Sequence, residues 1–244
     1  MQYMMKVLID NKIPGNVGIA IEFKIPNTSK RVDFIITGKD GQLKNTAIIV
    51  ELKQWTEADI VNGKDGIVQA FTGHALREVA HPSYQAWSYA TTIEDYNETV
   101  QDKQIDLHPC AYLHNYLAVT PPTLLSDNYK YYLEKAPAFI KGDVEKLREF
   151  INKYIQYGDD KETLYMIENG KIRPSKSLQD ALSSMLKGNE EFVMIDEQKL
   201  VYETALDMAR KSYKDGNKRV LVVKGGPGTG KSVLAINLLV RLTN

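Results

Sequence analysis

The chain has 244 residues, of which 43% are hydrophobic and 25% are charged, and these values are ordinary for one or two globular domains. Lys plus Arg and Asp plus Glu both number 31, so the net charge gives no sign of a polyanionic partner. The single cysteine, Cys110, excludes an internal disulfide and suits a reducing, cytoplasmic environment. The first residues lack the pattern of a signal peptide, and no run approaches the roughly 18 apolar residues of a membrane span. We therefore expect a cytoplasmic protein without a membrane partner.

The first part of the chain has the pattern of a mixed α/β unit. Runs of β-branched residues separated by turns predict strands over 19–23, 31–36 and 47–53. A helix is expected over 83–97, followed by an apolar strand over 111–119. A further amphipathic helix is expected to begin after Asp143 as N-cap and to end at Gly158. These elements predict a first domain over residues 1–157.

A polar segment and a nucleotide-binding motif follow. Residues 158–191 are expected to form a linker with a short helix, and residues 192–244 the start of an incomplete P-loop domain. That third region is expected to contain a helix over 200–213, an apolar strand over 220–223 and a helix over 232–242. Between the last two elements stands the sequence Gly-Gly-Pro-Gly-Thr-Gly-Lys-Ser at 225–232, which has the full P-loop spacing.

A P-loop binds the phosphates of a nucleotide through its backbone. Glycines let the N–H groups converge on the phosphates, a lysine reaches the β and γ oxygens, and a hydroxyl ligates magnesium. The positions expected to do this are Gly225, Gly228, Gly230, Lys231 and Ser232, which predicts ATP as a ligand. Hydrolysis also needs an acid, a water-positioning residue and an arginine finger from later strands, and the only charged side chain after Ser232 is Arg241. ATP turnover by these residues alone is not expected, and the remainder of the motor is an expected partner.

A second cluster of polar residues lies upstream, at the end of an apolar strand. Glu51 and Lys53 project on the same face of the strand as Ile49, because side chains alternate between faces. Burying such a pair is costly unless it has a task or partners. Asp33 lies inside the preceding strand, so a hairpin would bring the two carboxylates within reach of one ion such as Mg²⁺ or Mn²⁺. The alternative is a salt-bridge cluster on a surface edge strand.

Asp33, the Glu51-Leu52-Lys53 triplet and a later helix carrying Gln85 and Tyr89 stand in the order that resembles the PD-(D/E)xK restriction-endonuclease-like superfamily. The Gln-x-x-x-Tyr spacing is similar to an element of RecB-type nucleases. The resemblance implies an α/β fold with a mixed sheet flanked by helices, and metal-dependent cleavage of phosphodiester bonds. It also implies that Mg²⁺ or Mn²⁺ is held by Asp33, Glu51 and the carbonyl of Leu52, while Lys53 assists the attacking water. For Gln85 and Tyr89, a half-buried helical pair is the alternative.

This chain departs from the family pattern at two places. Val32 stands before Asp33 where the motif has proline, and no acid is evident in a helix before the first strand. Either Glu22 substitutes for that acid, or the helix is truncated or dispensable. Glu22 could equally pair with Arg31 or Lys24 across or along the strand.

Seven segments extend the resemblance over nearly the whole chain, namely 31–36, 49–55, 81–85, 112–116, 174–178, 195–198 and 224–232. They look like bacterial proteins that join a nuclease-like domain to a Schlafen-group-3-like DNA/RNA helicase. The resemblance implies a superfamily 1-type motor in which Gln198 reads adenine, the alternative being an ordinary residue of a helix N-terminus. It implies nucleic acid as partner, with DNA favoured over RNA, and leaves pairing into a homodimer open. Two other functions remain open, an inactive docking module that regulates the motor and an ATP-binding motor with a scaffold domain.

Four other residues, three histidines and the single cysteine, have side chains that could bind a metal or pack in the core. His108, Cys110 and His114 are spaced too irregularly for a zinc site, and Cys110 is expected to be a small packed residue. His81 precedes Pro82 and is expected to mark a helix N-terminus, with contact to a scissile phosphate as the alternative.

Overall fold

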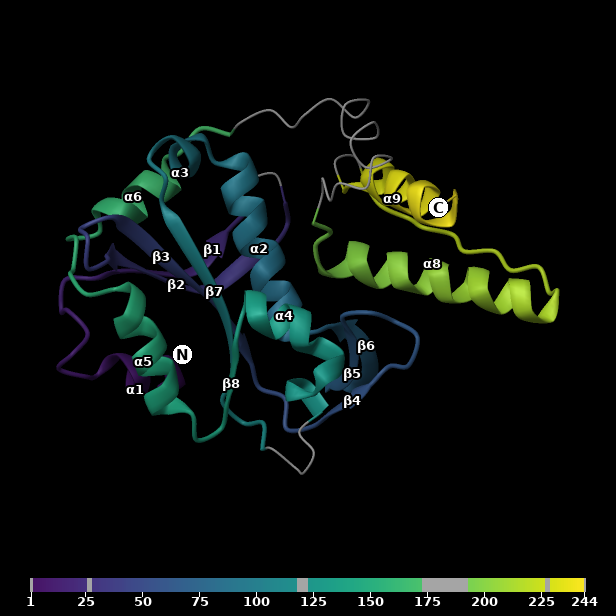
Figure 1. The fold of residues 1–244 in the computed structure, drawn as a ribbon, viewed down its shortest axis with the longest axis horizontal. Helices are drawn as coiled ribbons and strands as arrows, with labels where there is room; N and C mark the ends of the chain where they lie inside the picture. The colour runs from purple at the N-terminus through teal and green to yellow at the C-terminus, as the bar shows by residue number, and fades with distance from the viewer. Residues whose placement is uncertain (1, 26–27, 118–122, 173–192, 227–228, 244) are drawn as a thin grey trace.

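The computed structural model describes residues 2–25, 28–117, 123–172, 193–226 and 229–243. Over these ranges the chain is an α/β protein with a mixed five-stranded sheet, a second antiparallel sheet and flanking helices (Figure 1). The predicted α/β class and mixed sheet are confirmed at this level. Most of the predicted linker over 158–191, including its short helix, lies outside the described residues.

The main sheet is built around the predicted apolar strands. β1 (Gly18–Lys24), β2 (Arg31–Lys39) and β3 (Asn45–Lys53) run antiparallel to one another, and their β-branched residues suit a pleated, buried surface. β7 (Asp106–Leu113) and β8 (Ala138–Ile140) continue the sheet in parallel, giving the order β1-β2-β3-β7-β8. β3 is therefore a central strand. The predicted strands at 19–23, 31–36 and 47–53 are confirmed. The strand expected at 111–119 lies instead at Asp106–Leu113, so it begins and ends earlier than predicted.

Helices cover both faces of this sheet (Figure 1). On one face, α1 (Gln2–Leu8) and α5 (Val144–Tyr154) pack on the side chains of β2 and β3 that include Phe34 and Val50. On the other face, α2 (Pro82–Tyr96) and α6 (Glu162–Glu168) pack on Ile35 and Ile49, with α3 (Glu98–Asp102) beside them. Alternate residues of each strand thus enter two different cores.

A second sheet extends the domain beyond α2. β4 (Ala58–Ile60), β5 (Ile67–Thr72) and β6 (Ala75–Ala80) form an antiparallel meander, and Gly73 and His74 make the β5–β6 turn with positive φ angles of 57° and 63°. Two short 3-10 helices, η1 (Thr123–Leu125) and η2 (Asp127–Tyr129), and α4 (Lys130–Lys135) pack with this sheet around a core rich in tyrosine. The sequence analysis did not predict this sheet.

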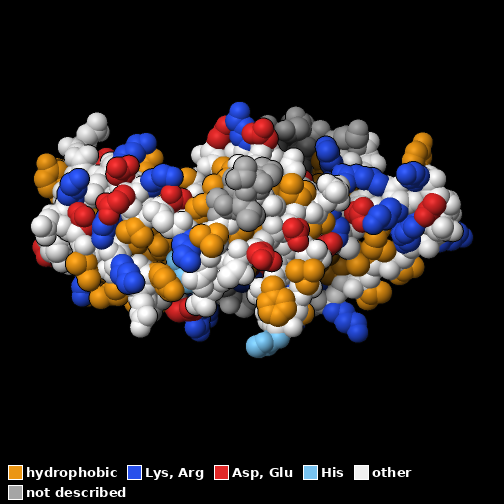
Figure 2. Space-filling view, turned by 90° about the horizontal axis from the view of Figure 1, so that it is seen from below, with side chains coloured by type: hydrophobic (Ala, Val, Ile, Leu, Met, Phe, Trp, Pro, Cys, Tyr) orange, Lys and Arg blue, Asp and Glu red, His pale blue; other side chains and the backbone are white. Residues whose placement is uncertain are grey.

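The last two helices lie together at one end of the molecule (Figure 1). α8 (Asp196–Asp215) packs against β6 and α2, and α9 (Lys231–Thr243) packs against α8. Figure 2 shows Lys and Arg side chains gathered at this end, where Arg210, Lys211, Lys214, Lys218 and Arg219 are exposed. None of the described helices is long and apolar enough to cross a membrane.

The strand predicted at 220–223 does not form. Val220 and Val222 are 83% and 71% exposed, and no described strand lies beside this segment. A strand acquires its hydrogen bonds only from a neighbouring strand, so apolar residues alone do not produce one here.

Candidate active site

The central strands separate where Asp33 and Glu51 face each other. The β2–β3 ladder ends at the pair Phe34 and Val50, and the same register places Asp33 opposite Glu51. There the Asp33 side chain replaces the backbone ladder, because its Oδ2 accepts the N–H of Leu52 at 2.7 Å. On the other side of Asp33, the β1–β2 ladder skips Glu22, whose φ of 53° lies in the left-handed region. The hairpin therefore brings the two predicted carboxylates together.

The Glu51 side chain is buried and forms an ion pair with Lys53. Its residue is 3% exposed, and its Oε1 accepts a hydrogen bond from Nζ of Lys53 at 2.6 Å. Its Oε2 is buried and has no hydrogen-bond partner among the described residues. The predicted face is confirmed, since Ile49 packs under α2 while Val50 and Leu52 pack on the opposite core. The alternative of a surface cluster on an edge strand is wrong, because β3 is central and Glu51 is buried.

Burial raises the pKa of Glu51 to about 8. Desolvation of the charged form is the main cause, the ammonium of Lys53 opposes it, and the charges of Asp33 and Asp196 add to it. A carboxyl group with this pKa changes its charge near neutral pH, which is uncommon outside functional sites.

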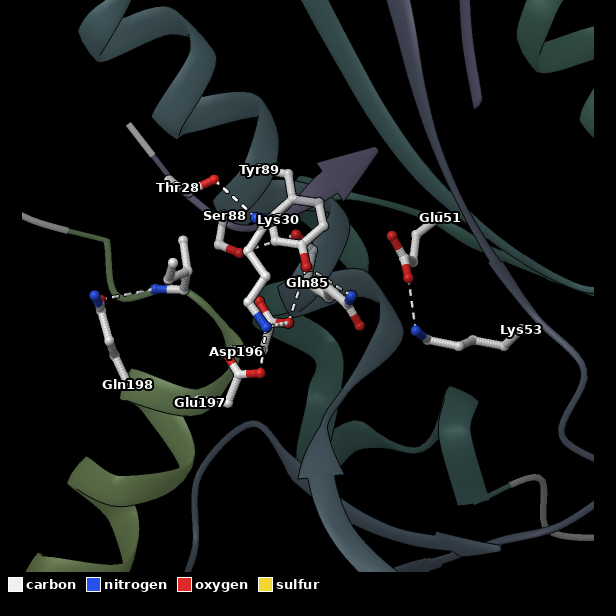
Figure 3. Close-up of polar contacts among 11 residues, drawn as sticks. Thr28, Lys30, Glu51, Lys53, Gln85, Ser88, Tyr89, Asp196, Glu197 and Gln198 are labelled. Carbon is white, nitrogen blue, oxygen red and sulfur yellow. Dashed lines mark hydrogen bonds and ion pairs between the residues drawn. The ribbon is translucent and has the colours of Figure 1, made fainter. Parts of the chain in front are cut away.

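Gln85 and Tyr89 lie together on α2, as their spacing predicts. The amide nitrogen of Gln85 donates to the Tyr89 hydroxyl at 3.0 Å, and Tyr89 is 2% exposed. Burial, with the charges of Asp196 and Glu51, raises the pKa of Tyr89 well above its usual range, so the hydroxyl keeps its proton and acts as a donor. Figure 3 shows Gln85 on the side of Tyr89 toward the Glu51–Lys53 pair.

His81 has a structural role at the start of α2. Its Nδ1 accepts the N–H of Ser83 at 3.1 Å, so Nε2 carries the proton and donates to the carbonyl of Leu124 at 3.0 Å. Burial lowers the pKa of His81 to about 4, and the side chain is fully buried. The helix boundary is confirmed, and the alternative contact with a scissile phosphate is wrong.

Two further charged residues belong to this cluster and were missed by the sequence analysis. Asp196, the first residue of α8, accepts a hydrogen bond from the Tyr89 hydroxyl at 2.8 Å through Oδ2. The same oxygen lies 3.1 Å from Nζ of Lys30, which also pairs with Glu197. Figure 3 shows Asp196 and Lys30 on one side of Gln85 and the Glu51–Lys53 pair on the other. The only sequence signal was an acidic residue at a helix start, which is a common feature.

The acid that the family pattern places in a helix before the first strand is not found in α1. α1 contains no acidic residue and packs with α5 on the face opposite α2. The Glu22 side chain is 59% exposed and lies 3.8 Å from Arg31, which agrees with the ion-pair alternative.

The donor set at this site suits a small, hard cation. No group of three or more His, Cys, Asp and Glu side chains in the described ranges is arranged to hold a metal. Mg²⁺, however, needs only one or two protein carboxylates and keeps several water molecules. Asp33 and Glu51 provide two carboxylates, and the buried Glu51 Oε2 has no hydrogen-bond partner within the described ranges, a place that a cation could fill.

His108, Cys110 and His114 are engaged in packing. Cys110 lies on β7 and is fully buried in the core, as expected, and burial raises the pKa of its thiol. The rings of His108 and His114 stack on Tyr154 and Tyr3.

The P-loop residues surround the start of α9, except that Gly228 lies outside the described residues. Nζ of Lys231 donates to the carbonyls of Gly225 and Gly226 at 2.7 and 2.6 Å, so the lysine folds over its own loop. Ser232 lies exposed in the first turn of α9, one residue after Lys231.

Gln198 lies against the same loop. Its amide nitrogen donates to the carbonyl of Thr229 at 3.2 Å. Gly230 has a φ of 78°, and a Cβ there would lie 2.2 Å from that nitrogen. Gln198 therefore lies in the first turn of α8, which agrees with the alternative of an ordinary helix N-terminal residue. It also contacts the P-loop, as a residue that reads adenine would need to.

Comparisons of the chain with protein-family models, curated proteins and solved structures found no match. The fold and the site define an α/β protein with a buried acidic cluster at the end of a central strand, close to the first turn of a helix that contacts a P-loop sequence.

Proposed function

We propose that the chain is a metal-dependent nuclease module of the restriction-endonuclease-like type, joined to the start of a helicase-like P-loop motor. The observation that carries the proposal is the buried Glu51 carboxylate, which has one oxygen on Lys53, one oxygen without a described partner, and Asp33 opposite it. Such a carboxylate is costly to bury for structure alone. A bound cation and a phosphodiester would offset the free-energy cost of burying it.

Each side chain of the site has a separate role in the proposed hydrolysis. A bound Mg²⁺ or Mn²⁺ would polarise the scissile phosphate and favour deprotonation of the attacking water. Asp33 fixes the end of β3 by accepting the Leu52 N–H, which orients the neighbouring backbone and the Glu51 side chain. Lys53 has three ammonium protons, and the contact with Glu51 uses one, so the others can orient water or a phosphate oxygen.

Gln85 and Tyr89 form the wall of the site on the α2 side. Because the Tyr89 hydroxyl donates to Asp196, it accepts from Gln85 and fixes the direction of that amide. In this arrangement the second N–H of the amide is held at a constant angle and is available to a substrate oxygen.

ATP is the proposed ligand of the second site. The support is the spacing of Lys231 and Ser232 at the start of α9, with Gln198 placed against the loop. Lys231 presently bonds two loop carbonyls, and a triphosphate would provide a stronger, charged partner for its ammonium.

Cleavage of labelled single- and double-stranded DNA and RNA tests the proposal. The chain is compared with and without Mg²⁺ or Mn²⁺, beside Glu51→Gln and the matched control Glu149→Gln, which changes an exposed carboxylate on α5. We expect metal-dependent cleavage that Glu51→Gln abolishes and the control retains. Binding of the substrates without cleavage in any metal would refute the nuclease and favour the docking module.

A further inference from the structure

The first turn of α8 contacts two sites that are far apart in the sequence. At its start, Asp196 binds the Tyr89 hydroxyl at 2.8 Å and the Lys30 ammonium at 3.1 Å, both beside the Glu51 cluster. Two residues later, the Gln198 amide donates to the Thr229 carbonyl of the P-loop at 3.2 Å. A single helical turn therefore bridges the acidic site and the nucleotide-binding sequence. Figure 3 shows Asp196 of this turn toward Tyr89 and Gln198 pointing away from it.

The two ends of this bridge are connected by the Gln198 side chain itself. Its Oε1 accepts the N–H of Ile195 at 3.2 Å, while its Nε2 binds Thr229. The Gln198 side chain therefore connects Thr229 to the residue that directly precedes Asp196.

The rest of α8 is anchored on the domain that carries Glu51. Lys199 is nearly buried and lies 3.1 Å from Asp65 and 2.8 Å from Glu203. Glu203 also accepts the backbone N–H of Asp65 at 3.1 Å. These contacts anchor α8 to the domain that carries Glu51. The first turn of the helix lies between the P-loop and α2.

We propose that this turn couples the P-loop to the nuclease site, with Asp196 as a positioning residue for Tyr89, Gln85 and Lys30. The inference rests on the proposed nuclease function. When a triphosphate takes the Lys231 ammonium from the carbonyls of Gly225 and Gly226, the loop that carries Thr229 rearranges. Asp196 then shifts against Tyr89, and the amide of Gln85 turns relative to Glu51 and Lys53.

The position of Asp196 supports the connection. Its Oδ2 accepts a hydrogen bond from the Tyr89 hydroxyl and lies 3.1 Å from Nζ of Lys30, so one oxygen holds both side chains. Its Oδ1 is buried and has no hydrogen-bond partner among the described residues, so the carboxylate is held at this place by Oδ2 alone. A small movement of the turn therefore changes both the hydrogen bond to Tyr89 and the ion pair with Lys30.

Amide hydrogen exchange of the intact chain, with and without ATP and Mg²⁺, tests the coupling without relying on cleavage. We expect ATP to change exchange at least about threefold at the start of α9 and also in α2, around Gln85 and Tyr89. Asp196→Ala should keep the response of α9 and lose that of α2. Asp196→Asn keeps an acceptor for Tyr89 and should retain part of it. Asp207→Asn, the same change at a residue of α8 that pairs with the exposed Lys211, should behave as the unaltered chain.

Cleavage kinetics give the second readout. We expect Asp196→Ala to lower kcat about tenfold with KM within about twofold, because the substrate still binds while the wall of the site is misplaced. An α2 whose exchange ignores ATP, or an Asp196→Ala variant with an intact α2 response, would overturn the coupling. Lack of metal-dependent cleavage by the unaltered chain would instead refute the nuclease and leave the exchange result readable.

Discussion

Glu51→Gln should stabilise the metal-free protein at high pH. Burial raises the pKa of Glu51 from an ordinary value of 4.5 to about 8. Below pH 4.5 the carboxyl group is protonated in the folded and the unfolded chain. Between pH 4.5 and 8 the unfolded chain releases the proton while the folded chain retains it, so the free energy of unfolding falls as the pH rises. Glutamine has no proton to release and avoids this loss.

The size of the effect follows from the two pKa values. A difference of about 3.5 corresponds to at most about 5 kcal/mol, at 1.36 kcal/mol for each pKa unit. Water that enters the site when the carboxylate ionises lowers this figure, and we expect a gain of at least about 1 kcal/mol at pH 8 over that at pH 5. For a chain of this length, each kcal/mol raises Tm by about 2–4 °C. Urea unfolding and thermal melting of both proteins at pH 5 and pH 8, with a chelator present, measure this gain in stability.

The matched control is Glu149→Gln, whose carboxylate is exposed on α5. It should change the free energy of unfolding by less than about 0.5 kcal/mol at both pH values. A Glu51→Gln variant that is less stable than the unaltered chain at pH 8, or equally affected at pH 5 and pH 8, would refute the assignment of Glu51 as a buried, destabilising carboxyl group.

Three other substitutions test separate contacts. Lys53→Ala should lower metal-dependent cleavage at least about 100-fold, since it removes the ammonium beside Glu51, and a rate within twofold of the unaltered chain would contradict that role. Glu203→Ala leaves the nearly buried Lys199 without its closest partner. The free energy of local unfolding of α8 should fall by about 3 kcal/mol, which amide exchange measures as faster exchange. Unchanged exchange would refute the role of this pair in anchoring α8. Arg148→Ala removes donors to the carbonyls of Val7 and Ile9 at the end of α1 and should cost about 1–2 kcal/mol in urea unfolding, whereas an unchanged midpoint would show these bonds to be unimportant.

The elements that were predictable are those with a strong local pattern. The β-branched runs of β1, β2 and β3 place the core strands, and the strict alternation in β3 assigns Glu51 and Lys53 to the face under α2. The i, i+4 spacing places Gln85 and Tyr89 together. These features depend on residues within one element or one hairpin, so the sequence carries them directly.

What the sequence could not reveal depends on distant contacts or on a missing neighbour. Asp196 meets Tyr89 across 107 positions of the chain, and no local pattern encodes that meeting. The residues over 220–223 have strand propensity but no described strand beside them, so their pattern misled the prediction. The β4–β6 sheet was overlooked even though Gly73 and His74 form a tight turn between two of its strands. These strands are short and do not alternate strictly between apolar and polar residues, so their pattern is weak.

Single-turnover cleavage as a function of Mg²⁺ or Mn²⁺ concentration tests the central claim most directly. Saturating labelled DNA or RNA is used, and the chain is compared with Glu51→Gln and Lys53→Ala. We predict a rate that rises with the metal ion and saturates in the unaltered chain, and that stays at background in both variants. Cleavage that persists in Glu51→Gln, or that is insensitive to a chelator, would contradict a metal-dependent nuclease at the Glu51 site.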